Sequence, residues 1–190
     1  MSEIAILVHE LTKSYGVAAA PVQALRGVSL TVRRGEKVAL LGKSGSGKST
    51  LLNLLGGLDL PTSGTIEVGG RDLGGMNRKE LARHRSQTVG MIFQSFNLIA
   101  SRTALQNVEL PLLFAGRAAA ERRTTARQAL EAVGLGERLH HRPSELSGGE
   151  HQRVAIARAL KNRPRIARFR SLSPATTRLT SAYRWPRFHW

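Results

Sequence analysis

Cysteine is absent from this 190-residue sequence, which excludes a disulfide framework, a thiolate metal site and a cysteine nucleophile. Long apolar runs are absent too, since a stretch such as residues 110–116 is far shorter than the roughly 20 residues that cross a bilayer. The first residues include Glu3 and no basic segment, which is not typical of a secretory signal. With 41% hydrophobic and 22% charged residues, the composition indicates a globular protein. We therefore expect a soluble protein of the cytoplasm.

Acidic residues are missing from the last part of the sequence. The net charge is +16, and residues 151–190 contain 10 Lys and Arg but no Asp or Glu. Residues 164–190 consist mostly of Arg, Ser, Thr and Pro, and no helix or strand periodicity fits them. A strongly basic chain is typical of nucleic-acid or membrane partners, but here much of the excess lies at one end. The composition predicts two parts, residues 1–163 and a disordered basic tail at residues 164–190.

The first part follows the pattern of an α/β protein. A short apolar run at residues 37–42 is typical of a strand buried in a parallel sheet, and a Gly-rich loop and a Leu-rich segment follow it. Further strands are expected at residues 4–16, 23–32, 65–70 and 88–94. Helices are expected after three N-cap residues, Asn77, Thr103 and Ser147. The order of strand, loop, helix and helical insertion predicts a nucleotide-binding α/β fold.

Residues 42–49, GKSGSGKS, match the phosphate-loop pattern G-x-x-x-x-G-K-[S/T] in every fixed position. The glycines let successive backbone amides face a phosphate, and the following helix adds its positive end. Lys48 would reach the β- and γ-phosphates of a nucleotide, and Ser49 would offer its hydroxyl to Mg²⁺. The alternative is a Gly/Ser loop with a chance lysine, which the flanking strand and helix argue against. The predicted nucleotide-binding residues here are Gly42, Lys43, Ser44, Gly45, Ser46, Gly47, Lys48, Ser49 and Thr50.

Residues 146–160, LSGGEHQRVAIARAL, resemble the signature motif of ABC-type ATPases. The usual form is L-S-G-G-Q, and Glu150 stands in the last place of this motif, a position that is often Glu among exporters of this group. Together with residues 27–64 and 89–112, this sequence is most similar to the lipoprotein-release and macrolide-export branch of that family. The resemblance covers about residues 1–163. It implies a P-loop NTPase of the ABC ATPase type, with an N-terminal antiparallel β subdomain and a helical signature subdomain.

The resemblance also implies roles for single residues and for partners. ATP and Mg²⁺ are the expected cofactors, with Tyr15 stacking on adenine and with Ser49 and Gln94 near the metal. Gln94 would also contact the attacking water and couple to the membrane subunits. Residues of the signature would hold the γ-phosphate of ATP bound to the other subunit of a homodimer, namely Ser147, Gly148, Gly149 and Glu150. A permease subunit would keep the protein at the cytoplasmic face of the membrane, and no specific nucleic acid is expected.

The resemblance ends where the catalytic carboxylates of the family are expected. An apolar strand ending in Asp-Glu should follow the signature helix, and in this chain the pair would fall near Arg170 and Ser171. Because no carboxylate occurs there or later, we expect no catalytic residue, an incomplete core sheet with an unpaired edge at residues 37–42, and loss of ATP hydrolysis. The tail is typical of translation in a wrong reading frame or of a truncated gene.

The sequence leaves three hypotheses about function open. The chain is either an ATP-binding subunit of an ABC transporter or a binding-only or non-functional fragment of one. The third hypothesis is a basic nucleic-acid-binding protein that binds through a natural tail at residues 164–190, and it predicts salt-sensitive binding.

Overall fold

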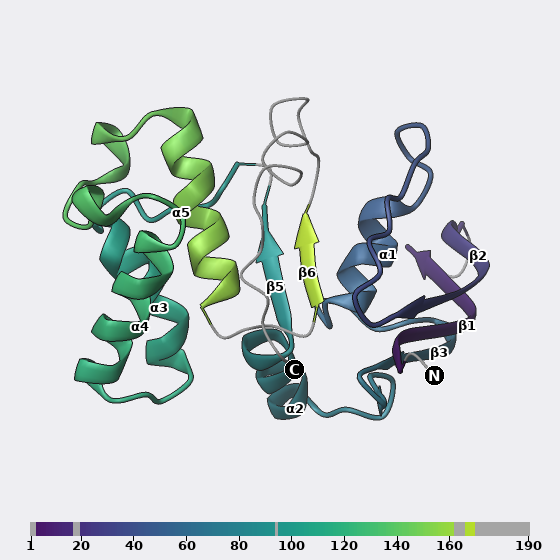
Figure 1. Cartoon of the computed structure of the whole chain (residues 1–190). Coiled ribbons are helices and arrows are strands. Elements are labelled where there is room, and N and C mark those ends of the chain that lie inside the picture. Colours follow the sequence, from purple (N-terminus) through teal and green to yellow (C-terminus); the bar gives the residue numbers. More distant parts are fainter. Residues whose placement is uncertain (1–2, 17–19, 94, 162–165, 170–190) are drawn as a thin grey trace.

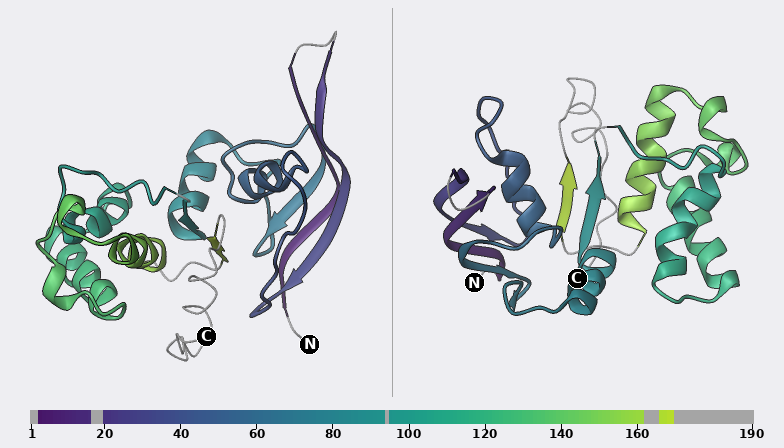
Figure 2. Two further views of the ribbon diagram at one scale, coloured as in Figure 1. Left: turned by 90° about the horizontal axis from the view of Figure 1, so that it is seen from above. Right: turned by 180° about the vertical axis from the view of Figure 1, so that it is seen from behind.

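The computed structural model describes residues 3–16, 20–93, 95–161 and 166–169, the last four by their backbone. The chain forms an antiparallel sheet with one helix, a small parallel sheet with another helix, and a group of helices (Figure 1). The antiparallel sheet and the helical group lie on opposite sides of the parallel strands in both further views (Figure 2).

The antiparallel sheet contains four strands in the order β2-β1-β3-β4. Their bounds are β1 (Ile4–Tyr15), β2 (Val22–Arg33), β3 (Ser63–Val68) and β4 (Arg71–Asp72). Helix α1 (Lys48–Leu55) follows the predicted phosphate loop and buries Leu51 and Leu54 against the sheet.

The inner face of this sheet is apolar because side chains alternate along each strand. In β3, Ile66 and Val68 are buried whereas Glu67 between them is exposed, as the alternating sequence predicts. The core under α1 consists of Ile6, Val8, Leu11, Leu25, Leu51, Leu54, Ile66, Val68 and Leu73. This packing holds the start of α1 and the loop before it against β2.

The helical group contains α3 (Ala104–Phe114), α4 (Ala119–Glu131) and α5 (Gly148–Leu160), with short 3₁₀ turns η1 (Gly136–Arg138) and η2 (Pro143–Glu145). Its core consists of Ala104, Leu105, Val108, Ala126, Leu130, Val133, Leu135, Leu139, Leu146, Val154 and Ala157.

The helix starts agree with the sequence. Thr103 and Ser147 cap α3 and α5, and each forms a reciprocal capping box with the residue three positions later. Asn77 does the same for α2 (Arg78–Gln87), whose third residue is Glu80. These side chains satisfy backbone N–H groups that a helix start leaves without acceptors.

The parallel sheet differs from the sequence prediction. It contains β5 (Val89–Ile92) and β6 (Ile166–Phe169), which pair in parallel from Val89 opposite Ile166 to Ile92 opposite Phe169. A strand at Val89–Ile92 was expected, but a strand after Pro164 was not, and that prediction was wrong for these four residues. Residues 166–169 have no clear strand pattern in the sequence. They form a strand because β5 lies parallel to them and supplies the backbone hydrogen bonds.

The strand predicted at residues 37–42 does not form. This segment has no assigned secondary structure, and its side chains Val38 and Leu41 are 53% and 90% exposed. An apolar run becomes a buried strand only when neighbouring strands accept and donate along both edges. Within the described residues, the parallel sheet consists of β5 and β6 and does not include this run.

No described helix combines the length and apolar character that a membrane crossing requires. The part of the chain that the structure describes also contains no group of three or more His, Cys, Asp or Glu arranged to hold a metal ion.

Candidate functional site

The predicted phosphate loop is exposed and leads directly into α1. Gly42, Gly45 and Gly47 have φ angles of 151°, 80° and 83°, a region that favours glycine. A Cβ added to Gly42 would lie 2.7 Å from the Ser46 Oγ atom, and one added to Gly47 would lie 2.4 Å from the Ala24 carbonyl oxygen. The path of the loop therefore depends on glycine at its first position and at the start of α1.

The Lys48 ammonium group closes this loop. Its Nζ atom donates to the carbonyl oxygens of Gly42 and Lys43, each at 2.7 Å, and to the Ser46 Oγ atom at 3.1 Å. The loop is thus folded around a cation at the N-terminus of a helix. Both the cation and the helix end favour anions. Ser49 is exposed in the first turn of α1, and Thr50 is half-buried beside it.

Tyr15 lies at the end of β1 and is 41% exposed. Its hydroxyl donates to Asp59 Oδ2 at 2.8 Å, and the Lys13 Nζ atom lies 4.9 Å from the ring centroid. Lys13 also pairs with Asp59 at 2.8 Å. Partial desolvation, then the hydrogen bond to Asp59 and its charge, raise the pKa of Tyr15, while Thr50 acts in the opposite direction. These contacts hold an aromatic ring beside the first turn of α1.

The signature residues form the start of α5. Ser147 Oγ accepts from the Glu150 backbone N–H at 3.3 Å, and Glu150 Oε2 accepts from the Ser147 backbone N–H at 2.8 Å. Arg138 donates from Nε to the other oxygen, Oε1, at 3.3 Å. Hydrogen bonds from the Ser147 backbone N–H, then from the Ser147 hydroxyl, and then from Arg138 lower the pKa of Glu150 to about 2. Ser147, Gly148 and Gly149 are exposed, so their backbone is accessible from outside.

The structure does not bring the two predicted phosphate-binding groups together within one chain. The loop before α1 and the start of α5 lie in parts that the parallel strands separate (Figures 1 and 2). Tyr15 and the loop, by contrast, lie on the same side, next to α1. Gln94, Arg170 and Ser171 lie outside the described residues.

Comparison with known proteins identifies the family. The sequence profile described as ABC transporter matches residues 25–168. This chain belongs to the ABC transporter family. The match extends beyond residue 163 and ends within β6.

Relatives agree with the branch that the sequence predicts. An uncharacterized ABC transporter ATP-binding protein of Thermotoga maritima is 53% identical over 155 residues, which are 82% of this chain and 66% of that protein. The macrolide export ATP-binding/permease protein MacB of Marinobacter nauticus is 50% identical over 157 residues, 83% of this chain and 24% of MacB. The uncharacterized ABC transporter ATP-binding protein YbbA of Escherichia coli is 50% identical over 165 residues, 87% of this chain and 72% of YbbA. The chain thus spans just under two-thirds of the first relative and about a quarter of MacB.

Solved structures confirm the ABC ATPase fold. A dimeric post-hydrolysis state of the ATP-binding cassette MJ0796, bound to ADP and Pi, superposes with a TM-score of 0.76 at 42% identity. The match covers 85% of this chain and 72% of that one. The antiparallel β part and the helical part that the sequence predicts are both features of this ABC fold.

Three residues of the site escaped the sequence analysis. Lys13 and Asp59 anchor Tyr15, and Arg138 pairs with Glu150. Each acts on a partner far away in the sequence or in a different element. The one available signal was the carboxylate of Glu150, because a carboxylate is stabilised by a nearby cation.

Arg158 links the signature helix to the segment that follows β5. Its guanidinium group donates to the carbonyl oxygens of Phe96 and, at 2.7 Å, Asn97. Both of these residues have positive φ, 58° and 46°, which is costly for the bulky side chain of Phe96 and tolerated by Asn97. Arg158 therefore stabilises a strained turn that follows Gln94 closely in the sequence.

We expect the substitution Arg158→Met to lower the free energy of unfolding by about 1.5–3 kcal/mol, because two carbonyl groups lose a charged donor. Urea denaturation followed by circular dichroism measures the change. Arg127→Met on α4, where the side chain is exposed, is the control and should change stability by less than about 0.5 kcal/mol. Equal stability of the two variants would show that Arg158 does not support the turn.

Proposed function

We propose that this chain is an ATP-binding subunit of an ABC transporter and that it binds Mg²⁺-ATP through residues 42–49. The observation that carries the proposal is the loop folded around the Lys48 ammonium group at the start of α1. When a nucleotide binds, the triphosphate would compete for Lys48 with the two carbonyl groups that now accept from it. A phosphate oxygen is the better acceptor because it is charged.

The residues present fit a triphosphate and its metal ion. Gly42 and Gly47 leave space where a Cβ atom would collide with the loop or with β2, so the backbone can approach a ligand closely. Ser49 presents an exposed hydroxyl in the first turn of α1 and would hold Mg²⁺ with Gln94. The metal ion would neutralise charge between the phosphates.

Tyr15 is proposed to stack on adenine. The support is its half-exposed ring beside α1, held by Asp59 through its hydroxyl. Aromatic rings bind flat bases through offset stacking, and a fixed ring loses little entropy on binding.

The signature residues are proposed to bind the nucleotide of a second subunit. In one chain they lie apart from the phosphate loop, so a complete site requires two chains. The dimeric MJ0796 structure and the fusion of ATP-binding and permease parts in the name of MacB support a dimer that works with a permease. The expected location is the cytoplasmic face of a membrane, through the permease.

Two alternatives are distinguished by simple measurements. A binding-only module would bind ATP and form no product, which separates affinity from turnover. A nucleic-acid-binding protein would bind DNA or RNA with an affinity that falls steeply with salt, and would lose it on removal of residues 164–190. The second alternative is less well supported, because the family match lies almost wholly before the tail.

The direct test is the substitution Lys48→Ala. We expect the dissociation constant for ATP to rise about 10- to 100-fold, because a charge-assisted contact to the phosphates is lost. Isothermal titration calorimetry measures the affinity, and circular dichroism checks that the variant remains folded. Lys37→Ala removes the same charge from an exposed side chain before the loop and should leave the affinity within about twofold. Equal affinity of wild type and Lys48→Ala would remove the loop from the proposal.

A further inference from the structure

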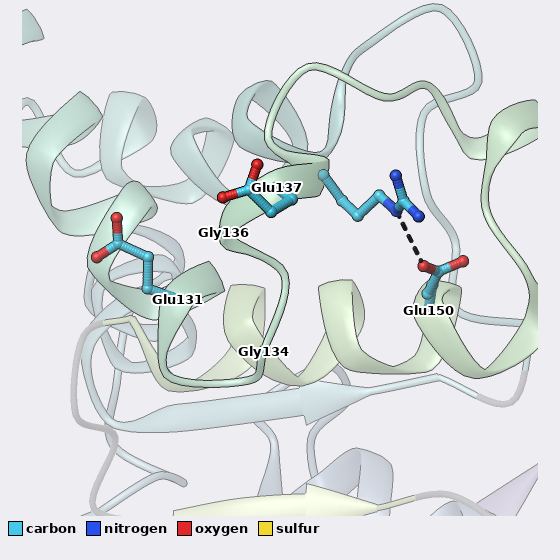
Figure 3. Close-up of a pocket in the computed structure, with 6 residues that line it drawn as sticks. Glu131, Gly134, Gly136, Glu137 and Glu150 are labelled. Carbon is cyan, nitrogen blue, oxygen red and sulfur yellow. Dashed lines mark hydrogen bonds and ion pairs between the residues drawn. The ribbon is translucent and has the colours of Figure 1, made fainter.

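The pair formed by Arg138 and Glu150 lies in an open depression beside the signature helix. Figure 3 shows the pair as a dashed contact that reaches Glu150, with Glu131 across the depression. Arg138 is the one cation among the six residues that line the depression, which are Glu131, Gly134, Gly136, Glu137, Arg138 and Glu150.

Glu150 creates an electrostatic conflict at this position. The start of α5 presents free backbone N–H groups, which attract an anion. The Glu150 carboxylate in the first turn already accepts from the Ser147 N–H and repels a phosphate that approaches the N–H groups beside it. A glutamine at this position has no charge, so this conflict arises from the Glu150 carboxylate.

Arg138 contacts the carboxylate without disturbing the helix cap. It donates to Oε1, while the Ser147 N–H donates to Oε2. A further contact, at 3.4 Å from Nη1 to the His141 Nε2 atom, helps to orient the guanidinium group. Removal of the Arg138 charge should therefore leave the capping box intact and expose the Glu150 charge to the approaching anion.

We propose that Arg138 neutralises Glu150 so that the start of α5 keeps its affinity for a polyphosphate. Arg138 acts through Glu150 and is a positioning residue of the signature site. The inference rests on the proposed function, since it assumes that the signature residues bind phosphate groups of a nucleotide.

Tripolyphosphate is the probe, because it carries the phosphate chemistry without adenine. The ¹⁵N-labelled full chain is titrated with it, and the backbone amide signals of Gly148 and Gly149 report binding at the start of α5. In Arg138→Gln we expect the dissociation constant at these two signals to rise about threefold to tenfold. In Glu150→Gln it should stay equal to wild type or fall.

The decisive variant is the double substitution Arg138→Gln with Glu150→Gln, whose dissociation constant should return to within about twofold of Glu150→Gln alone. A merely structural role of Arg138 would not be rescued in this way. Arg83→Gln on α2 removes the same charge from an exposed side chain and should leave the two signals unaffected. Signals that do not respond to tripolyphosphate in wild type, or a loss in Arg138→Gln that persists in the double variant, would overturn the inference.

Sedimentation of the same proteins with ATP tests the proposed function separately. A response of Gly148 and Gly149 to tripolyphosphate without ATP-dependent dimers would contradict the second-subunit part of the proposed function and leave Arg138 in its role. ATP-dependent dimers, together with a loss in Arg138→Gln that persists in the double variant, would support the proposed function and contradict the role of Arg138.

Discussion

The 190-residue chain is expected to bind ATP and to release phosphate no faster than its Lys48→Ala variant. The phosphate loop and Lys48 can hold the triphosphate, but water activation also requires a group that accepts or polarises its proton. General-base assistance is typically worth 10²–10⁴-fold in rate, and loss of metal positioning adds to that deficit. The resemblance to the family predicts these carboxylates near Arg170 and Ser171, and no Asp or Glu occurs after Glu150 in the sequence.

We expect that the remaining polar groups do not replace these carboxylates. Gln94 has an amide that can orient a water molecule but cannot take its proton at neutral pH. Glu150 is paired with Arg138 and with the Ser147 N–H, and its pKa of about 2 makes it a weak base. It also lies at the start of α5, away from the loop of its own chain (Figure 1).

Phosphate release from Mg²⁺-ATP by the purified chain measures this expectation. Lys48→Ala sets the background, and Glu150→Gln tests whether the one acidic residue of the signature takes part. Turnover near one per second that disappears in Lys48→Ala would contradict the prediction and reveal a replacement group.

Gly47→Ala is expected to remove both ATP binding and a large share of the stability. The substituted residue would have to keep a φ of 83°, and its Cβ would lie 2.4 Å from the Ala24 carbonyl oxygen and 2.8 Å from Leu25 Cδ2. Backbone strain of about 1–2 kcal/mol and overpacking of about 1–3 kcal/mol together predict a loss of about 2–5 kcal/mol in the free energy of unfolding. Relief of the clash would move the start of α1 away from β2 and displace Lys48.

Gly45→Ala is the matched control for this prediction. Gly45 has nearly the same φ, 80°, but a Cβ there meets no atom within 4 Å. It should cost only the strain, about 1–2 kcal/mol, and leave α1 in place. Urea denaturation and ATP calorimetry on both variants separate the two effects, and equal losses in both variants would show that contact with β2 is unimportant.

Features that depend on residues near one another in the sequence were predicted correctly. Thr103, Asn77 and Ser147 cap their helices because each cap involves a side chain and a backbone group three residues apart. Ile66 and Val68 are buried in β3 because side chains of a strand alternate between its two faces every second residue, which is also a local pattern. The two family motifs are also local strings, so the sequence by itself determined the family and the branch.

Features that depend on through-space partners required the tertiary structure. Residues 37–42 are apolar enough for a strand, yet no strand forms there, whereas residues 166–169 become β6 because β5 lies alongside. A strand needs a neighbouring strand whose backbone groups pair with its own. The local sequence pattern does not show which segment will be that neighbour.

The same reason separates the site residues into two classes. Lys48 and Ser147 were predicted as site residues because their motifs are contiguous, while the contacts of Asp59 with Tyr15 and of Arg158 with Asn97 were not predicted. Those contacts join residues 44 and 61 positions apart, and only the packing of α1 and α5 on the strands brings them together. The sequence by itself determined the motifs that predict phosphate binding. The tertiary structure decided which side chains hold those motifs in place, because an ion pair or hydrogen bond depends on distance in space rather than on separation along the chain.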